Sequence, residues 1–429
     1  MTRRGSSLHA ADPAMVGLMA LAALNYTSSI GCRITVALAG LHAGLSPALI
    51  GPMVAGFALI PMFFGVRAGR LVDRIGPQRP MVAGTALIVL GAAACALAPH
   101  PIVLMASAVV IGVGNMGFHL SMQQAAGEIG GGARRTGNFN LLTMSFSISG
   151  ILGPPLAGFI IDHFGHRAAF AAMALIAFGI MIGCRMFPFA RHLPRAASSA
   201  PQAAVQQAAS DASAQPSPAG RSPAGASAMG SSPTPMATQS AWASGMELLG
   251  EKPLRRFLIA SLTISAGWDA FQFLIPLHAH AIGLSASAVG LSIASFSAGS
   301  LTVRLFMSFL LARLSTAQWV MVAMGTCAGA YALLPFSGAL PVLMAIAFVL
   351  GTGPGIGQPL LMAAMHGAAP AGRGGETAGL RMTLQSTQQI VLPVLLGLLG
   401  SVLGVSPLFW LYSVLVAAVM LSMRGKLGE

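Results

Sequence analysis

The most unusual chemical groups in this chain are ionisable side chains inside long apolar runs. Asp269 lies near the middle of one such run, in the segment GWDAFQ at 267–272, and it is the only one of the ten acids that falls mid-run. A charge in hydrocarbon is costly, so a residue of this kind is a functional candidate by default. We expect Asp269 to carry protons, and a structural bond to a neighbouring helix is the alternative.

Two other ionisable groups share this setting. Arg33 lies inside the first apolar run, where a permanently charged guanidinium suits a bidentate contact to an anionic ligand. A salt bridge from Arg33 to Asp269, or an outward-pointing side chain, is the alternative. His119 lies in the middle of the fourth run and could carry protons near neutral pH, with a packing role as its alternative.

Polar side chains without charge accompany these groups. Gln385 and Gln389 are four residues apart, a spacing that places both on one face of a helix. In an apolar span such a face must turn toward a cavity or another polar helix. The polar residues that we expect to line a common cavity with Arg33 are Asn25, Tyr26, Gln123, Trp268, Gln272, Gln358, Gln385 and Gln389.

Composition indicates what surrounds these groups. Of the 429 residues, 55% are apolar and 8% are charged, against about 25% charged in soluble proteins. This excludes a soluble enzyme, a disordered chain and a nucleic-acid binder, because the +13 net charge is spread thinly between apolar runs. The four cysteines are isolated within such runs, so we expect no disulfide framework, metal site or cofactor.

Apolar runs long enough to cross a bilayer predict an all-α polytopic membrane protein with twelve transmembrane helices. If both termini are cytoplasmic, nearly all of the 23 lysines and arginines fall on the cytoplasmic side, as the positive-inside rule requires. The expected spans are 13–40, 47–67, 80–98, 101–126, 138–162, 167–187, 256–282, 287–311, 318–335, 340–365, 377–402 and 405–423.

The twelve spans divide into two related halves. A segment rich in Ala, Ser, Pro and Gln predicts a flexible cytoplasmic linker at 191–250, between six-helix bundles at 1–190 and 251–429. The halves also match at one offset of 239 residues, as from Gly44 to Gly283. The matched pairs are Gly44-Leu45-Ser46 with Gly283-Leu284-Ser285, Gly51 with Gly290, Phe57 with Phe296, Arg74 with Arg313, and Arg33 with Gln272. Two similar bundles around a midplane cavity are a transporter architecture.

The loop after the second span carries a known signature. Residues 69–79 read GRLVDRIGPQR, which resembles the G-x-L-x-D-R-x-G-x-x-R motif of the major facilitator superfamily, although the usual basic pair after the second glycine is replaced by Pro77-Gln78. The resemblance implies that this motif latches the two bundles together on the cytoplasmic side. The gate residues that it implies are Gly69, Arg70, Asp73, Arg74, Gly76 and Arg134.

The fifth span contains GILGPPLAG at 150–158. This is similar to an element of the drug and metabolite:proton antiporter branch of that family, through Gly150, Gly153, Pro154 and Gly158, with plain helix packing as the alternative. The arginine that this branch carries in the fourth span is absent from 112–124. The resemblance implies a secondary active transporter that exports a small organic compound in exchange for protons.

Other functions stay open at this point. A proton symporter or a facilitator for metabolite uptake belongs to the same class, and a membrane signalling protein on the same scaffold belongs to another. An intramembrane enzyme is not expected, because no paired acids, Ser/His dyad or P-loop is present. We expect a monomer in a bacterial inner membrane, since the richness in Ala, Gly and Arg suggests a GC-rich genome. Its partners would be lipid, protons and a small-molecule substrate, without nucleic acid.

Overall fold

The computed structural model describes residues 13–129, 135–186, 247–307, 314–368 and 374–424, and in these ranges the regular structure is helical. The helices begin and end close to the expected spans. They are α1 (Pro13–His42), α2 (Pro47–Ile75), α3 (Gln78–Leu97), α4 (Pro101–Glu128), α5 (Arg135–Met186), α8 (Lys252–Ala281), α9 (Ala286–Leu305), α11 (Thr316–Leu333), the short 3-10 helix η3 (Leu334–Phe336), α12 (Leu340–Ala368), α13 (Gly374–Leu403) and α14 (Ser406–Met423).

Local sequence explains where several helices start and stop. The Ser315 hydroxyl accepts from the backbone N–H of Gln318, whose side chain returns a bond to the Ser315 N–H, so α11 begins with a capping box. Gly44 and Gly283 adopt φ of 73° and 74° in the turns before α2 and α9, a backbone conformation that glycine reaches without strain. The two turns that match at the 239-residue offset therefore have the same geometry.

Helix α5 consists of two expected spans that meet at a kink. Its 52 residues, at about 1.5 Å each, are more than twice as long as the roughly 30 Å hydrocarbon core of a bilayer. Gly165, at φ 82°, is a non-helical point inside it. Eleven described helices are long and apolar enough to cross a membrane, and dividing α5 at Gly165 gives twelve spans. The predicted all-α polytopic fold class is confirmed.

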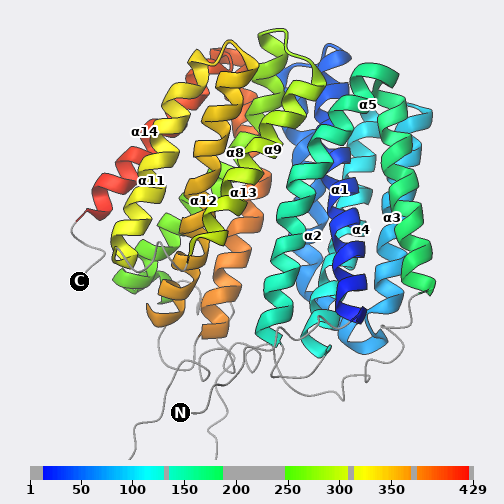
Figure 1. Cartoon of the computed structure of the whole chain (residues 1–429), viewed down its shortest axis with the longest axis horizontal. Coiled ribbons are helices and arrows are strands. Elements are labelled where there is room, and N and C mark those ends of the chain that lie inside the picture. Colours follow the sequence, from blue (N-terminus) through cyan, green and yellow to red (C-terminus); the bar gives the residue numbers. More distant parts are fainter. Residues whose placement is uncertain (1–12, 130–134, 187–246, 308–313, 369–373, 425–429) are drawn as a thin grey trace, which may run out of the picture.

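The helices form two groups that stand side by side (Figure 1). Helices α1 to α5 make one group, in which α1 packs on α5 and α3 on α4, and helices α8 to α14 make the other, in which α12 packs on α9 and α11. The predicted linker lies almost wholly within 187–246, outside the described residues, so the proposed domain limits at 190 and 250 stay predictions. The first turn of α1, in dark blue, and the end of α14, in red, point toward the lower side of the bundle in Figure 1; we call this end the terminal side and the opposite end the distal side.

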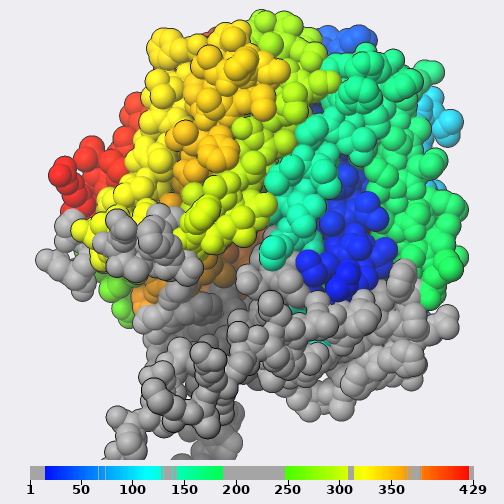
Figure 2. Space-filling view, in the orientation of Figure 1, coloured from blue at the N-terminus to red at the C-terminus, as the bar shows by residue number. Residues whose placement is uncertain are grey.

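The two groups meet mainly along two helix pairs, which we call the α2–α13 seam and the α5–α9 seam. Figure 2 shows α5 and α9 in contact on one face of the molecule. At the first seam a Cβ on Gly51 would overlap the backbone carbonyl of Pro393, and at the second a Cβ on Gly290 would overlap that of Pro154. These pairs are related by the same 239-residue offset. The relation recurs in Gly397 against Pro47 and Gly158 against Ala286.

One contact at the α5–α9 seam joins the two halves through a charge. The Asp162 carboxylate, near the distal end of the first span in α5, accepts from the backbone N–H groups of Ala286 at 2.9 Å and Ser287 at 2.8 Å. These groups open the first turn of α9, where free N–H groups and the helix dipole favour an anion. Both seams thus hold the distal ends of the two halves together.

Candidate functional site

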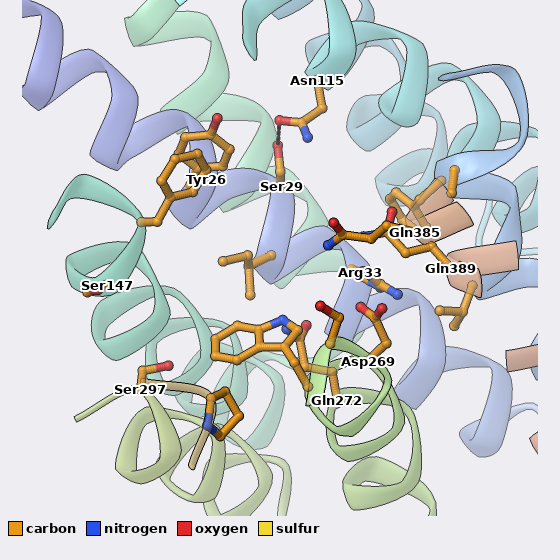
Figure 3. A pocket seen from close by; sticks show the side chains of 18 of the residues that line it. Tyr26, Ser29, Arg33, Asn115, Ser147, Asp269, Gln272, Ser297, Gln385 and Gln389 are labelled. Atoms are coloured by element: carbon orange, nitrogen blue, oxygen red, sulfur yellow. Dashed lines mark hydrogen bonds between the residues drawn. The ribbon is translucent and has the colours of Figure 1, made fainter. Parts of the chain in front are cut away.

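A cavity of about 540 Å³ lies between the two groups of helices (Figure 3). Eight helices contribute to its wall: α1, α2, α4 and α5 from the first half, and α8, α9, α12 and α13 from the second. Most of the residues that the sequence analysis expected to line a cavity do so. They are Tyr26, Arg33, Trp268, Asp269, Gln272, Gln358, Gln385 and Gln389.

Asp269 lies in the interior of the protein, away from lipid. It belongs to α8, only 3% of its surface is exposed, and its carboxylate accepts from Nε2 of Gln388 on α13 at 3.2 Å. Arg33 of α1 extends into the same space, and Figure 3 shows its guanidinium beside the Asp269 carboxylate. Within the described part of the chain the guanidinium of Arg33 makes neither a hydrogen bond nor an ion pair within 4 Å, although its charge interacts with that of Asp269. Its donors are therefore available to a ligand.

A polar network joins α1 to α4 on the opposite wall. The Asn115 carbonyl oxygen accepts from Asn25 and from the hydroxyl of Ser29, both at 3.1 Å. Ser29 and Asn115 line the cavity, whereas Asn25 is buried behind them and is not in the lining. The binding role of Asn25 stays a prediction, and the structure adds Asn115. Its polar side chain in the middle of the fourth span is the signal that could have identified it.

His119 is also set back from the cavity. Its ring forms hydrogen bonds with the Tyr26 hydroxyl and, at 2.6 Å, with Nε2 of Gln123 one turn further along α4. The rings of Tyr26 and Phe146 are 4.0 Å apart, and both line the cavity. Neither His119 nor Gln123 is in the lining, so any proton that His119 exchanged with the cavity would pass through Tyr26.

Arg304 also lines the cavity, a position that was not predicted from the sequence. It lies in the last turn of α9, and its buried Nε has no hydrogen-bond partner in the described structure. The available signal was a second arginine inside an apolar run. Three serines of the second half also line the cavity: Ser265, Ser297 and Ser300.

The predicted gate lies at the terminal-side end of α2. Arg70 and Arg74 are exposed there, and Gly76, at φ 80°, ends the helix. Gly69 lies within α2, directly before Arg70. The side chain of Asp73 and the whole of Arg134 lie outside the described residues. The latch that the motif implies stays a prediction.

The antiporter-like element takes part in close helix packing. A Cβ on Gly150 would be 2.5 Å from the Ser297 hydroxyl, and one on Gly153 would be 3.0 Å from the backbone oxygen of Thr27. Pro154 and Gly158 form the α5–α9 seam described above. All four residues therefore have a packing role, which explains the element without reference to antiport.

Comparison with known proteins agrees with this architecture. The family model described as Major Facilitator Superfamily matches residues 18–386 and 257–425. A comparison with curated protein sequences gives no match.

Solved structures of the same fold cover almost the whole chain. A nucleoside transporter, NupG (D323A mutant), is 12% identical, with a TM-score of 0.74 over 96% of this chain and 99% of its own. A POT family transporter in complex with a thioalcohol-conjugated peptide is 12% identical, with a TM-score of 0.71 over 97% and 96%. A peptide transporter, POT, in complex with sulfate is 16% identical, with a TM-score of 0.70 over 97% and 95%.

At such identities these structures show the fold alone, whereas the family model covers most of the chain. With its helical membrane fold, its duplicated halves and a polar cavity between them, the chain belongs to the major facilitator superfamily, a family of secondary active transporters and not of enzymes.

Proposed function

We propose that this protein couples the movement of a small organic solute across the membrane to the movement of protons, with Asp269 as the coupling carboxyl group. The observation that supports this is the position of Asp269, which is buried in α8 and faces a cavity shared by both halves. Among the described residues that line the cavity, it is the only acid. A buried carboxyl at this depth is a group that can bind a proton on one side of the membrane and release it on the other.

The seams support alternating access as the mechanism. Contacts between the halves run mainly along α2 with α13 and α5 with α9, and the close backbone approaches at Gly51 and Gly290 lie near the distal ends of α2 and α9. The cavity lies between the same halves. Rocking of one half against the other would break the seams and open the cavity to the distal side, as in transporters built from two repeats.

The direction of transport is a separate proposal. Export in exchange for protons rests on the resemblance of residues 150–158 to the antiporter branch, and these residues already have a packing role at the α5–α9 seam. The second candidate is uptake of the solute together with a proton. The two arginines that line the cavity beside a single acid favour it.

Solute-driven proton movement in proteoliposomes tests the coupling role. Wild-type protein, with a pH-sensitive dye trapped inside the vesicles, should produce a proton flux when a transported solute from a metabolite screen is added. Asp269→Asn should abolish that flux, because the amide cannot exchange a proton at neutral pH. Exchange of labelled solute across the membrane without net proton movement should persist, since the cavity keeps its shape.

Glu251→Gln is the matched control, because Glu251 is an exposed acid directly before α8. It should leave both the proton flux and the exchange unchanged. If Asp269→Asn moves protons with the solute at the wild-type rate, the coupling role of Asp269 is wrong. If no solute in the screen moves, the protein is not a transporter of small organic solutes.

A further inference from the structure

We infer that the solute is an organic anion and that it binds together with a proton, so that transport is proton–anion symport. This inference rests on the proposed function, because it takes the same cavity as the transport site. It goes further by assigning the charge of the solute, the residues that recognise it and the sign of the coupling.

The charge of the cavity wall is the first argument. Two arginines, Arg33 and Arg304, line the cavity together with one acid, Asp269, among the described residues. The wall therefore has one positive charge in excess when Asp269 is ionised, and two when it is protonated. In a site of low dielectric, this excess attracts anions and repels cations.

The state of the two arginines is the second argument. Nothing in the described structure accepts a hydrogen bond from the Arg33 guanidinium, and the buried Nε of Arg304 is also without a partner. A buried cation that no protein group satisfies is costly, and a carboxylate, sulfonate or phosphate ligand would satisfy it in a bidentate way. Arg33 thus presents free donors to whatever occupies the cavity, and Arg304 adds a positive charge to the cavity wall.

Depth separates the roles of the two arginines. Arg304 is one residue before the end of α9 on the terminal side, whereas Arg33 is nine residues before the distal end of α1. We assign the anionic group to Arg33, which faces Asp269, and a guiding role at the terminal-side part of the cavity to Arg304. Removal of Arg304 should therefore weaken binding less than removal of Arg33.

The two walls of the cavity differ in polarity, which indicates the rest of the solute. The first half contributes Arg33 and the aromatic rings of Tyr26, Phe57 and Phe146. Apart from Trp268, the second half contributes mainly amides, hydroxyls and charges. A solute with an apolar body and a polar, anionic group matches both walls.

Asp269 determines the sign of the coupling. When Asp269 is ionised, its negative charge lowers the electrostatic potential at Arg33 and repels an anion there. When Asp269 is protonated, this repulsion is absent. Anion and proton therefore favour each other's binding, and by linkage the effect is reciprocal. Two ligands that favour each other cross together, which is symport, whereas antiport would need a solute that competes with the proton.

The other groups around Asp269 do not change this sign. Tyr331 of α11 and Tyr412 of α14 are buried near it, and their hydroxyls donate to the backbone oxygens of Gly267 and Thr263. Gln388 of α13 is uncharged. From α9 the cavity receives Arg304, and from α2 and α12 the lining residues carry no titratable side chain. Arg33 is the charged group that Asp269 faces most directly (Figure 3).

Three benzene derivatives, one anionic, one neutral and one cationic, test the inference by binding alone, in detergent and without transport. Benzenesulfonate stays ionised at any practical pH, benzenesulfonamide is its neutral isostere, and benzyltrimethylammonium is a cation of similar size. We expect benzenesulfonate to raise the melting temperature of the wild-type protein in a saturable way, and the other two to have little effect. Its affinity should be roughly five- to tenfold higher at mildly acidic than at mildly alkaline pH.

Variants locate the effect. Arg33→Gln should weaken benzenesulfonate binding by about tenfold or more, Arg33→Lys less, and Arg304→Gln less than Arg33→Gln. Asp269→Asn should bind benzenesulfonate with equal affinity at both pH values. The matched control is Arg167→Gln, since Arg167 is exposed near the distal side of α5, and it should behave as wild type.

The inference is overturned if benzenesulfonate does not stabilise the protein, if the cation stabilises it better, or if affinity for benzenesulfonate falls toward acidic pH. The wild-type ligand series gives this answer even if a variant fails to fold. Should Asp269→Asn keep full proton coupling in vesicles while benzenesulfonate still binds through Arg33, the proposed coupling role fails and the anionic substrate class survives.

Discussion

The α2–α13 and α5–α9 seams are copies of one contact that have diverged in charge. Both pack a glycine against the backbone carbonyl of a proline, Gly51 on Pro393 and Gly290 on Pro154. At the α5–α9 seam, Asp162 accepts from the first turn of α9. The residue that matches Asp162 at the 239-residue offset is Ser401, whose hydroxyl donates to the backbone oxygen of Leu398 in its own helix. The α2–α13 seam therefore has no acid at this position.

The start of the helix differs in the same way. Ser285 caps α9 by accepting from Ala288, whereas the matching Ser46 makes no side-chain cap at α2. Pro47, which begins α2 in place of Ala286, has no N–H to offer an acid. Duplication has therefore preserved the packing of both seams and left an electrostatic cap on one. We expect the α2–α13 seam to open at lower cost than the α5–α9 seam.

The largest expected effect comes from disrupting the close glycine packing that both seams share. Gly51→Val and Gly290→Val each place a branched side chain against a backbone carbonyl, and overpacking of this kind costs about 1–3 kcal/mol. Each should shift the protein toward a distal-open state and reduce transport by roughly tenfold. Labelling of a cavity cysteine, Ser300→Cys, by an impermeant maleimide from the distal side should increase to a similar extent in both.

Gly179→Val is the control for these variants, because Gly179 is an exposed glycine of α5 with open space around its Cβ position. It should label and transport as the parent does. Unequal effects of valine at Gly51 and Gly290 would show that packing at the two seams does not contribute equally to closing the distal side.

A smaller effect should follow from removing the charge of Asp162, which the α5–α9 seam has and the α2–α13 seam lacks. Asp162→Asn keeps the shape of the side chain and loses its charge, and an anion at a helix N-terminus contributes about 0.3–1 kcal/mol. Distal labelling of the same cavity cysteine should increase roughly two- to fivefold. Ser401→Ala, at the matching position, should leave labelling unchanged, and an equal increase in both variants would remove the asymmetry between the seams.

The smallest effect should come from installing the missing cap. The double variant Pro47→Ala, Ser401→Asp gives the α2–α13 seam both an N–H donor and an acid, with Pro47→Ala alone as its control. Labelling of the cavity cysteine from the distal side should be lower in the double variant than in Pro47→Ala alone, by up to about fivefold. An increase would mean that the two helix starts do not have equivalent geometry.

Much of the fold could be predicted from the sequence, because each spanning segment must satisfy its own backbone in a helix and present an apolar surface to lipid. The duplication was visible from Gly44 and Gly283 because glycines at tight turns and close contacts tolerate few replacements. The two spans within α5 were predicted as separate segments, and Gly165, at φ 82°, breaks the helix between them.

The site was predictable in part. Asp269 and Arg33 are conspicuous because charge is rare in an apolar run, and both line the cavity. Asn115 and Arg304 were missed because the face that each turns inward depends on how neighbouring helices are rotated, which one sequence does not specify. His119, for which a proton-carrying role was predicted, lies one hydrogen bond behind Tyr26 and outside the cavity lining.

The central claim is that the solute binds in the cavity beside Asp269 and that solute binding and protonation of Asp269 favour each other. Measuring proton uptake on ligand binding tests this claim most directly. Benzenesulfonate, which carries no exchangeable proton, would be added to the purified protein in weakly buffered detergent near neutral pH, with a dye reporting the pH. The account predicts net proton uptake by the wild-type protein and none by Asp269→Asn. Proton release by the wild-type protein, or equal uptake by the variant, would contradict it.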